Sequence, residues 1–130
     1  MTGSERTCPI RGDGGRALRA VLDRIGTRWT LLVVATLDRG GLRFGELERR
    51  LPGISQRMLT LTLRNLERDG LVSRTAHPEV PPRVVYALTA TGRSLIGPAL
   101  ALAGWAAEHA PDLEERRAAH EARETAAHDE

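Results

Sequence analysis

The chain has 130 residues, enough for one compact domain with a single hydrophobic core. Only one Phe, one Tyr and two Trp are present, so Leu, Val and Ala must fill the interior, which favours a helix-rich fold. No apolar run is long enough for a membrane span or a leader peptide, and one cysteine, Cys8, cannot form an internal disulfide, so we expect a cytoplasmic protein without membrane contact.

Charge is distributed unevenly along the chain. Residues 1–107 carry 16 Arg against 9 acidic residues, a net charge of +7, whereas residues 108–130 carry 3 Arg against 8 acidic residues, a net charge of −5. Every basic side chain is Arg, whose planar guanidinium suits bidentate contacts with phosphate and guanine. A basic globular part of this kind predicts an anionic partner such as nucleic acid.

The N-terminal third predicts a loose arm followed by two helices. Residues 1–13 are polar, with Gly, Pro and Ser, and should form a flexible arm. Residues 15–25 show helical spacing and predict a helix with one buried face. Its apolar positions are Leu18, Val21, Leu22 and Ile25. Residues 28–37 are apolar nearly all round, which is typical of a helix at the centre of a core.

Two further helices are expected on either side of a tight turn. Phe44, Leu47 and Leu51 give the apolar face of a short third helix, which Pro52-Gly53 ends. Ser55 is a predicted N-cap, after which a fourth helix runs to Gly70. Its apolar positions are Leu59, Leu63 and Leu66. This arrangement predicts a helix-turn-helix.

The remaining chain predicts a hairpin, a further helix and a tail. Residues 71–77 and 83–89 have strand character on either side of a proline-rich tip, so a β-hairpin wing should follow the helix-turn-helix. Helical spacing resumes over residues 89–109, although Gly97-Pro98 should kink or split that helix. Residues 111–130 form a polar, acidic tail, either a frayed helix or disordered.

The expected fold class is therefore mainly α with a small β-hairpin wing. We expect a winged helix-turn-helix domain over residues 14–110 that includes a C-terminal dimerisation helix.

The fourth helix carries the candidate nucleic-acid site. With its leucines facing the core, Arg57, Arg64 and Arg68 fall on the opposite side, a stripe with three Arg and no acid. Leu61 lies on the same side, where it can meet a thymine methyl in the major groove. The stripe has either of two interpretations, a solvated charged face or a major-groove recognition face; its position between a turn and a wing favours the second.

Neighbouring segments add candidate contacts to DNA. Ser55 and Gln56, at the start of the fourth helix, are placed to bind a phosphate. Arg74 and Arg83 on the hairpin arms, with His77 near its tip, suit the DNA backbone or minor groove. The complete set expected to contact DNA is Arg43, Ser55, Gln56, Arg57, Thr60, Leu61, Arg64, Arg74, His77 and Arg83.

These segments together resemble the HxlR-type family of winged helix-turn-helix regulators. The resemblance covers about residues 22–108 and rests on RIGTRWTLLVVATL, RFGELERRLPGISQRMLTLTLRNLERDGLVSR, HPEVPPRVVYALTATG and Trp105. It implies a dimer joined through the terminal helices, operator binding by the fourth helix and wing, and control of nearby genes.

A cysteine near the N-terminus belongs to the same resemblance. Cys8-Pro9 resembles the Cys-Pro pair of many family members, whose thiol senses electrophiles or oxidants. The gap from this pair to Trp29 is several residues longer here than in the family pattern. Cys8 is therefore either a redox-sensing residue or a free thiol on the arm.

The last expected helix is too apolar for one small domain to cover. Its apolar residues spread widely around the helix, and leaving several in water would favour aggregation, so a second copy should cover them. The expected dimer interface consists of Leu18, Leu22, Leu95, Ile96, Ala99, Leu102 and Trp105.

The residues give no sign of catalysis, since no nucleophile and base, paired carboxylates or zinc-spaced ligands occur. We therefore expect no enzyme, no metal and no cofactor. The predicted function is that of a sequence-specific transcriptional regulator, expected to repress, that binds an inverted-repeat operator in double-stranded DNA as a homodimer. An electrophile, an oxidant or a small-molecule ligand is the expected effector. The alternative is a ligand-sensing or protein-interaction module that has this fold but does not bind DNA tightly.

Overall fold

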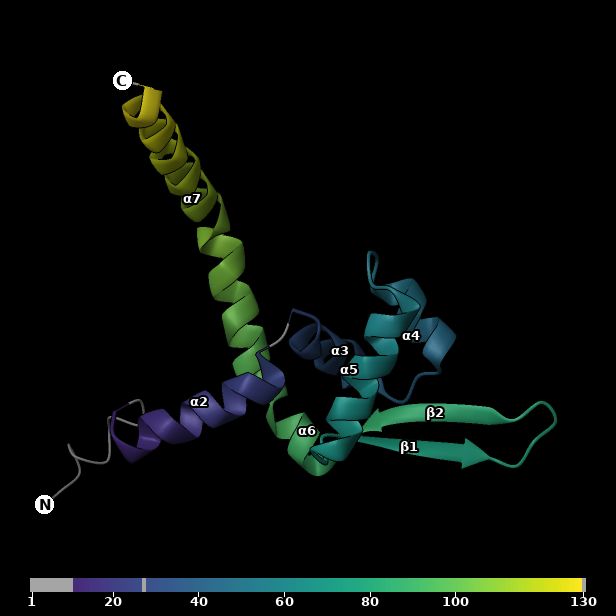
Figure 1. Ribbon diagram of the computed structural model, residues 1–130. Helices are drawn as coiled ribbons and strands as arrows, with labels where there is room; N and C mark the ends of the chain where they lie inside the picture. The colour runs from purple at the N-terminus through teal and green to yellow at the C-terminus, as the bar shows by residue number, and fades with distance from the viewer. Residues whose placement is uncertain (1–10, 27, 130) are drawn as a thin grey trace, which may run out of the picture. The chain divides into compact units, whose positions relative to one another are not determined.

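The computed structural model describes residues 11–26 and 28–129 and confirms a mainly helical fold with one two-stranded hairpin (Figure 1). The chain divides into two compact units, residues 1–96 and residues 97–130. Its elements in chain order are α2 (Asp13–Ile25), α3 (Thr30–Thr36), the 3-10 helix η1 (Leu37–Arg39), α4 (Phe44–Arg50), α5 (Gln56–Arg68), β1 (Val72–His77), β2 (Arg83–Leu88), α6 (Ala90–Ser94) and α7 (Ile96–Asp129).

The core of the first unit lies between α3, α4 and α5. Val33 and Val34 of α3 and Leu47 of α4 are completely buried, as the apolar spacing predicted. The predicted core face of α5 is confirmed, since Leu59, Leu63 and Leu66 are all buried. Thr62 is buried on the same side, where its hydroxyl donates to the Met58 carbonyl oxygen at 2.8 Å and so keeps a hydrogen bond. The helix-turn-helix is thus held by one continuous apolar cluster.

Helix α3 is shorter and less enclosed than its composition predicts. It covers Thr30–Thr36 and passes into η1, whereas the sequence predicts a single helix over residues 28–37. Leu32 is 49% exposed, so the expectation of an apolar helix covered nearly all round is wrong on that side. The buried side of α3, with Val33 and Val34, belongs to the core cluster, and the side with Leu32 does not.

The hairpin is joined to both flanking helical segments. Strands β1 and β2 pair antiparallel, with Val72 opposite Leu88 and His77 opposite Arg83. Leu42 adds an isolated antiparallel bridge to Tyr86 beside the hairpin. At the base, the Thr89 N–H donates to the Leu71 carbonyl oxygen at 3.1 Å, and the Thr89 hydroxyl donates to the Gly70 carbonyl oxygen at 2.6 Å. Thr89 also caps α6 by accepting from the Gly92 N–H at 3.1 Å.

Helix α2 forms as predicted, but its apolar face is not buried within the single chain. Leu18, Val21 and Leu22 are 41%, 48% and 50% exposed, and only Ile25 packs against the core cluster. Of the whole helix, therefore, only the last turn reaches the core. The prediction of one buried face is wrong for the domain alone because helical spacing identifies an apolar face without identifying what covers it.

The expected interruption at Gly97-Pro98 is confirmed as a split. Helix α6 ends at Ser94 and α7 begins at Ile96, so that Pro98 lies in the first turn of α7. A proline there costs no helical hydrogen bond, because the first N–H groups of a helix have no partner within it.

Taken by itself, the second unit is a continuous helix as far as Asp129, including the tail expected to be frayed or disordered. Pro111 lies inside it and removes one ladder hydrogen bond. Polar side-chain pairs one turn apart stabilise the segment beyond it. They are Arg116–Asp112 at 3.0 Å, Arg117–Glu121 at 3.5 Å and His120–Glu124 at 2.8 Å.

Candidate nucleic-acid interface

The exposed side of α5 is the centre of the candidate interface. Arg57, Arg64 and Arg68 are exposed there, as are Thr60 and Leu61. Within residues 11–26 and 28–129, no carboxylate forms an ion pair with any of these three arginines. Their guanidinium groups are therefore available to phosphates or base edges.

One acidic side chain borders this arginine face. Glu67 is exposed and lies about 60° around the helix from Arg64, close to the line of Thr60. The face is therefore basic along one side of α5 and bounded by a carboxylate near its C-terminal end.

An apolar patch lies within the arginine face, and the sequence pattern indicated only its Leu61 part. Leu61 is 47% exposed, and Met58, one turn earlier, is 39% exposed. A hollow of about 260 Å³ adjoins both side chains, and Trp29 contributes to its wall. Met58 is absent from the predicted contacts, although its spacing of three residues from Leu61 is a signal that places both side chains on one side of the helix.

The start of α5 has the cap that the sequence predicts. The Ser55 hydroxyl oxygen accepts from the Met58 N–H at 3.0 Å, so this oxygen already has one partner. Gln56 and Arg57 occupy the first turn, where backbone N–H groups have no partner within the helix. Accepting from Met58 leaves the Ser55 O–H as a donor, so a phosphate near Ser55 would accept from this hydroxyl and from the first-turn N–H groups.

Arg43 lies at the start of α4, with its side chain exposed. The Glu46 carboxylate accepts from the Arg43 backbone N–H at 3.0 Å, which fixes this end of the helix. A hollow at this junction also has Arg49 and Arg83 in its wall. The fold thus brings Arg43 and Arg83 to one place, which spacing along the sequence could not show.

The hairpin presents its basic side chains unequally. Arg74 on β1 is exposed. Arg83 on β2 is partly buried, and its Nη2 lies 3.2 Å from Glu79 Oε1. His77, opposite Arg83, is also partly buried. Arg74 is thus the hairpin cation best placed for an external anion, whereas Glu79 already balances part of the Arg83 charge.

The described residues include the predicted dimer face but not the predicted redox residue. Cys8 lies outside the described residues. Within α7, Leu102 and Trp105 are 52% and 50% exposed, and the Trp105 ring stacks on His109 with centroids 4.6 Å apart. Leu95 and Ile96 are partly buried against the core cluster of the first unit, which leaves only part of their surface for a partner.

Neither a metal site nor a membrane span is apparent in the part of the chain that the structure describes. No group of three or more His, Cys, Asp or Glu side chains gathers there in an arrangement suited to a metal ion. Among the described helices, none combines the length and the apolar character needed to cross a bilayer.

Comparison with known proteins identifies relatives that match more than two thirds of the chain. The profile of the HxlR-like helix-turn-helix family matches residues 24–114. An HTH-type transcriptional regulator of Methanothermobacter thermautotrophicus is 51% identical over 89 residues, 68% of this chain and 68% of the relative.

Solved structures give the same result. The reduced form of the redox regulator HypR is 40% identical, with a TM-score of 0.71 over 76% of this chain and 98% of that chain. The diamide-treated form of YodB from Bacillus subtilis is 34% identical, with a TM-score of 0.61 over 69% of this chain and 89% of that chain.

Proposed function

The chain belongs to the HxlR-like helix-turn-helix family of transcriptional regulators, and from this premise we propose that it binds an inverted-repeat operator as a homodimer. Helix α5 enters the major groove, and the β1–β2 hairpin lies along the adjacent backbone. The observation that carries this proposal is the arginine face of α5, where three exposed guanidinium groups have no ion-pair partner among the described residues and are available to phosphates and base edges.

The contacts divide into those that read bases and those that position the duplex. Arg57 and Arg64 lie on the exposed side of α5 and are assigned to base edges. Arg74, Arg43 and the N–H groups at the start of α5 are assigned to phosphates, with Arg83 contributing less because Glu79 shares its charge. Specificity therefore resides in α5, and most of the salt dependence resides outside it.

The dimer would place two copies of α5 about 34–36 Å apart, one turn of DNA. Support comes from exposed apolar side chains on two helices. They are Leu18 and Leu22 on α2, and Leu102 and Trp105 on α7. A twofold interface buries such surfaces on both copies at once. Repression is the proposed outcome because a dimer on a promoter excludes polymerase without requiring an additional activating surface.

An oxidant response is proposed for Cys8. HypR is named a redox regulator, and YodB has been crystallised after diamide treatment. This chain has a single cysteine, so a disulfide must join two chains or link one chain to a small thiol. In either case two thiols lose two protons and two electrons to the oxidant as one S–S bond forms.

The experiment that tests the proposal measures binding to DNA upstream of the protein's own gene by fluorescence anisotropy. Arg57→Ala and Arg64→Ala should each weaken specific binding by about 1–3 kcal/mol and alter the preferred sequence. Arg123→Ala, which removes the same charge from the far part of α7, is the matched control and should leave affinity nearly unchanged. If both α5 variants bind like the wild-type protein, α5 is not the recognition helix.

A further inference from the structure

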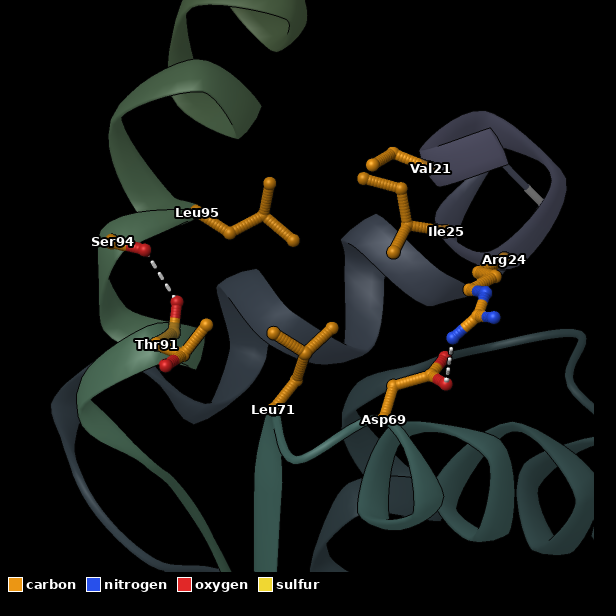
Figure 2. A pocket seen from close by; sticks show the side chains of 8 residues that line it. All are labelled: Val21, Arg24, Ile25, Asp69, Leu71, Thr91, Ser94 and Leu95. Carbon is orange, nitrogen blue, oxygen red and sulfur yellow. Dashed lines mark hydrogen bonds and ion pairs between the residues drawn. The ribbon is translucent and has the colours of Figure 1, made fainter. Parts of the chain in front are cut away.

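An apolar hollow in the first unit has no role in DNA contact. It has a volume of about 310 Å³ and lies between the end of α2, the segment after α5, and α6 (Figure 2). Val21 and Ile25 line it from α2, Leu71 from the segment after α5, and Leu95 from the residue after α6. Figure 2 shows these four side chains pointing toward a common space. This volume is at the lower end of the range for small-molecule sites.

One side of the hollow is closely packed and hydrogen-bonded, whereas the other side, formed by α2, has few buried contacts within the chain. The Leu71 N–H donates to the Leu66 carbonyl oxygen at 2.9 Å, and the Leu71 carbonyl oxygen accepts from Thr89. Helix α6 packs so closely there that a Cβ on Gly92 would lie 2.1 Å from the Leu71 oxygen. Helix α2, in contrast, buries no residue completely. A molecule in the hollow would therefore contact a closely packed floor on one side and, on the other, a helix that reaches the core of its own chain only through Ile25.

The polar groups at the edge restrict the kind of molecule that fits. Arg24 Nη1 lies 3.2 Å from Asp69 Oδ1, and the two charges balance (Figure 2). The Arg24 side chain is 69% exposed, so it keeps N–H groups that can donate to a further acceptor. Asp69, close by, repels anions. These features favour an uncharged, mostly apolar molecule with a carbonyl or hydroxyl oxygen.

The same edge lies at the C-terminal end of the proposed recognition helix. Asp69 is the C-cap residue of α5, and its N–H donates to the Asn65 carbonyl oxygen at 3.0 Å. Leu71 directly precedes β1. A molecule that changes how α2 rests on Asp69 and Leu71 thus acts where both DNA-contacting elements meet.

We infer that this hollow is an effector site for an uncharged one- or two-ring compound carrying a carbonyl or hydroxyl group, and that its occupation changes DNA affinity. The inference rests on the proposed function. A ligand alters DNA affinity only if it binds the DNA-bound and free forms differently, and the coupling is then equal in both directions.

The test uses the full-length protein and Prodan, an uncharged naphthalene ketone whose fluorescence shifts to the blue in apolar sites. Saturable binding is expected in the wild-type protein and should be lost in Val21→Trp, which fills the hollow from α2. Ala20→Trp places the same side chain on an exposed neighbouring position outside the hollow and should preserve binding. Ser94→Leu fills the hollow from α6 and should also abolish binding. The same loss in two independent variants would show that it does not arise from misfolding of Val21→Trp.

The second measurement is the operator affinity with and without saturating Prodan, for which we expect a change of about fivefold or more. Absence of Prodan binding, binding that persists in both filled variants, or binding without an effect on operator affinity would each overturn the inference. Operator binding by the ligand-free protein is measured first, because its absence would refute the proposed function instead. A dimer dissociated by Val21→Trp, with no Prodan bound to the wild-type protein, would assign the hollow to the subunit interface and also overturn the inference.

Discussion

Leu61 provides a test of base reading that does not depend on charge. It is 47% exposed between arginines, beside Met58 and the hollow walled by Trp29, so the DNA group it fits is apolar. The only apolar group that a base pair presents in the major groove is the C5 methyl of thymine. Replacing that thymine with deoxyuridine removes the methyl and leaves every hydrogen-bonding atom in place.

The expected size of the effect follows from the area involved. Covering one methyl-sized group is worth about 0.8 kcal/mol, which is about fourfold in affinity for each half-site. A dimer makes the contact twice, so removing both methyl groups should cost about 1.6 kcal/mol, or about 15-fold. In Leu61→Ala the same replacement should cost little, because the partner side chain is absent.

The assay is fluorescence anisotropy on an operator defined by footprinting, with deoxyuridine introduced at one thymine position of the half-site at a time, first in one half-site and then in both. Leu113→Ala is the control variant, since Leu113 lies on α7 and its exposed fraction of 50% is similar to that of Leu61. It should show the full wild-type sensitivity to deoxyuridine. If no thymine in either half-site is sensitive, or if the sensitivity survives in Leu61→Ala, the assignment of Leu61 to a thymine methyl is refuted.

Three other predictions address the hairpin, the cysteine and the dimer. Arg74→Ala should weaken binding to all DNA sequences alike and lower the salt slope by about 0.9 for each phosphate that is no longer neutralised; an unchanged slope in a salt titration would contradict it. Cys8→Ser should keep its DNA affinity under reducing conditions and lose any response to diamide, whereas a wild-type complex that ignores diamide would make Cys8 a bystander. Leu102→Arg combined with Trp105→Ala should give a folded monomer by light scattering that binds whole and half operators equally; a double variant that stays dimeric would exclude this interface.

Much of the first unit was predictable because its signals are local. The Leu59, Leu63 and Leu66 spacing placed the arginines of α5 on the exposed side, and Ser55 marked its start, since helix geometry fixes both relations. The sequence could not show that Arg43 and Arg83 share one junction, because that depends on how the hairpin packs. It also could not show the hollow beside Leu71, which requires α2 and α6 to be placed together.

The open and the wrong expectations have physical causes as well. Pro111 and the polar composition after it leave the tail open between a frayed helix and disorder, and the ion pairs beyond it together with the many alanines favour the helix. The prediction of a buried face on α2 is wrong for a different reason. An apolar stripe has the same spacing whether its own domain or a second copy covers it, so the spacing alone does not identify the covering surface.

Thr89 makes three hydrogen bonds at the base of the hairpin, so a small rotation there produces a large displacement at the tip. Its hydroxyl and N–H tie the hairpin base to Gly70 and Leu71, while the same side chain caps α6, so the base cannot pivot without shifting that helix. The two strands, of six residues each, extend about 20 Å from the hairpin base. A tilt of about 10° at the base therefore displaces the tip by about 3.5 Å, more than the length of a hydrogen bond to phosphate. In the proposed complex, a displacement of this size at the hairpin tip would be enough to break a contact with the DNA backbone.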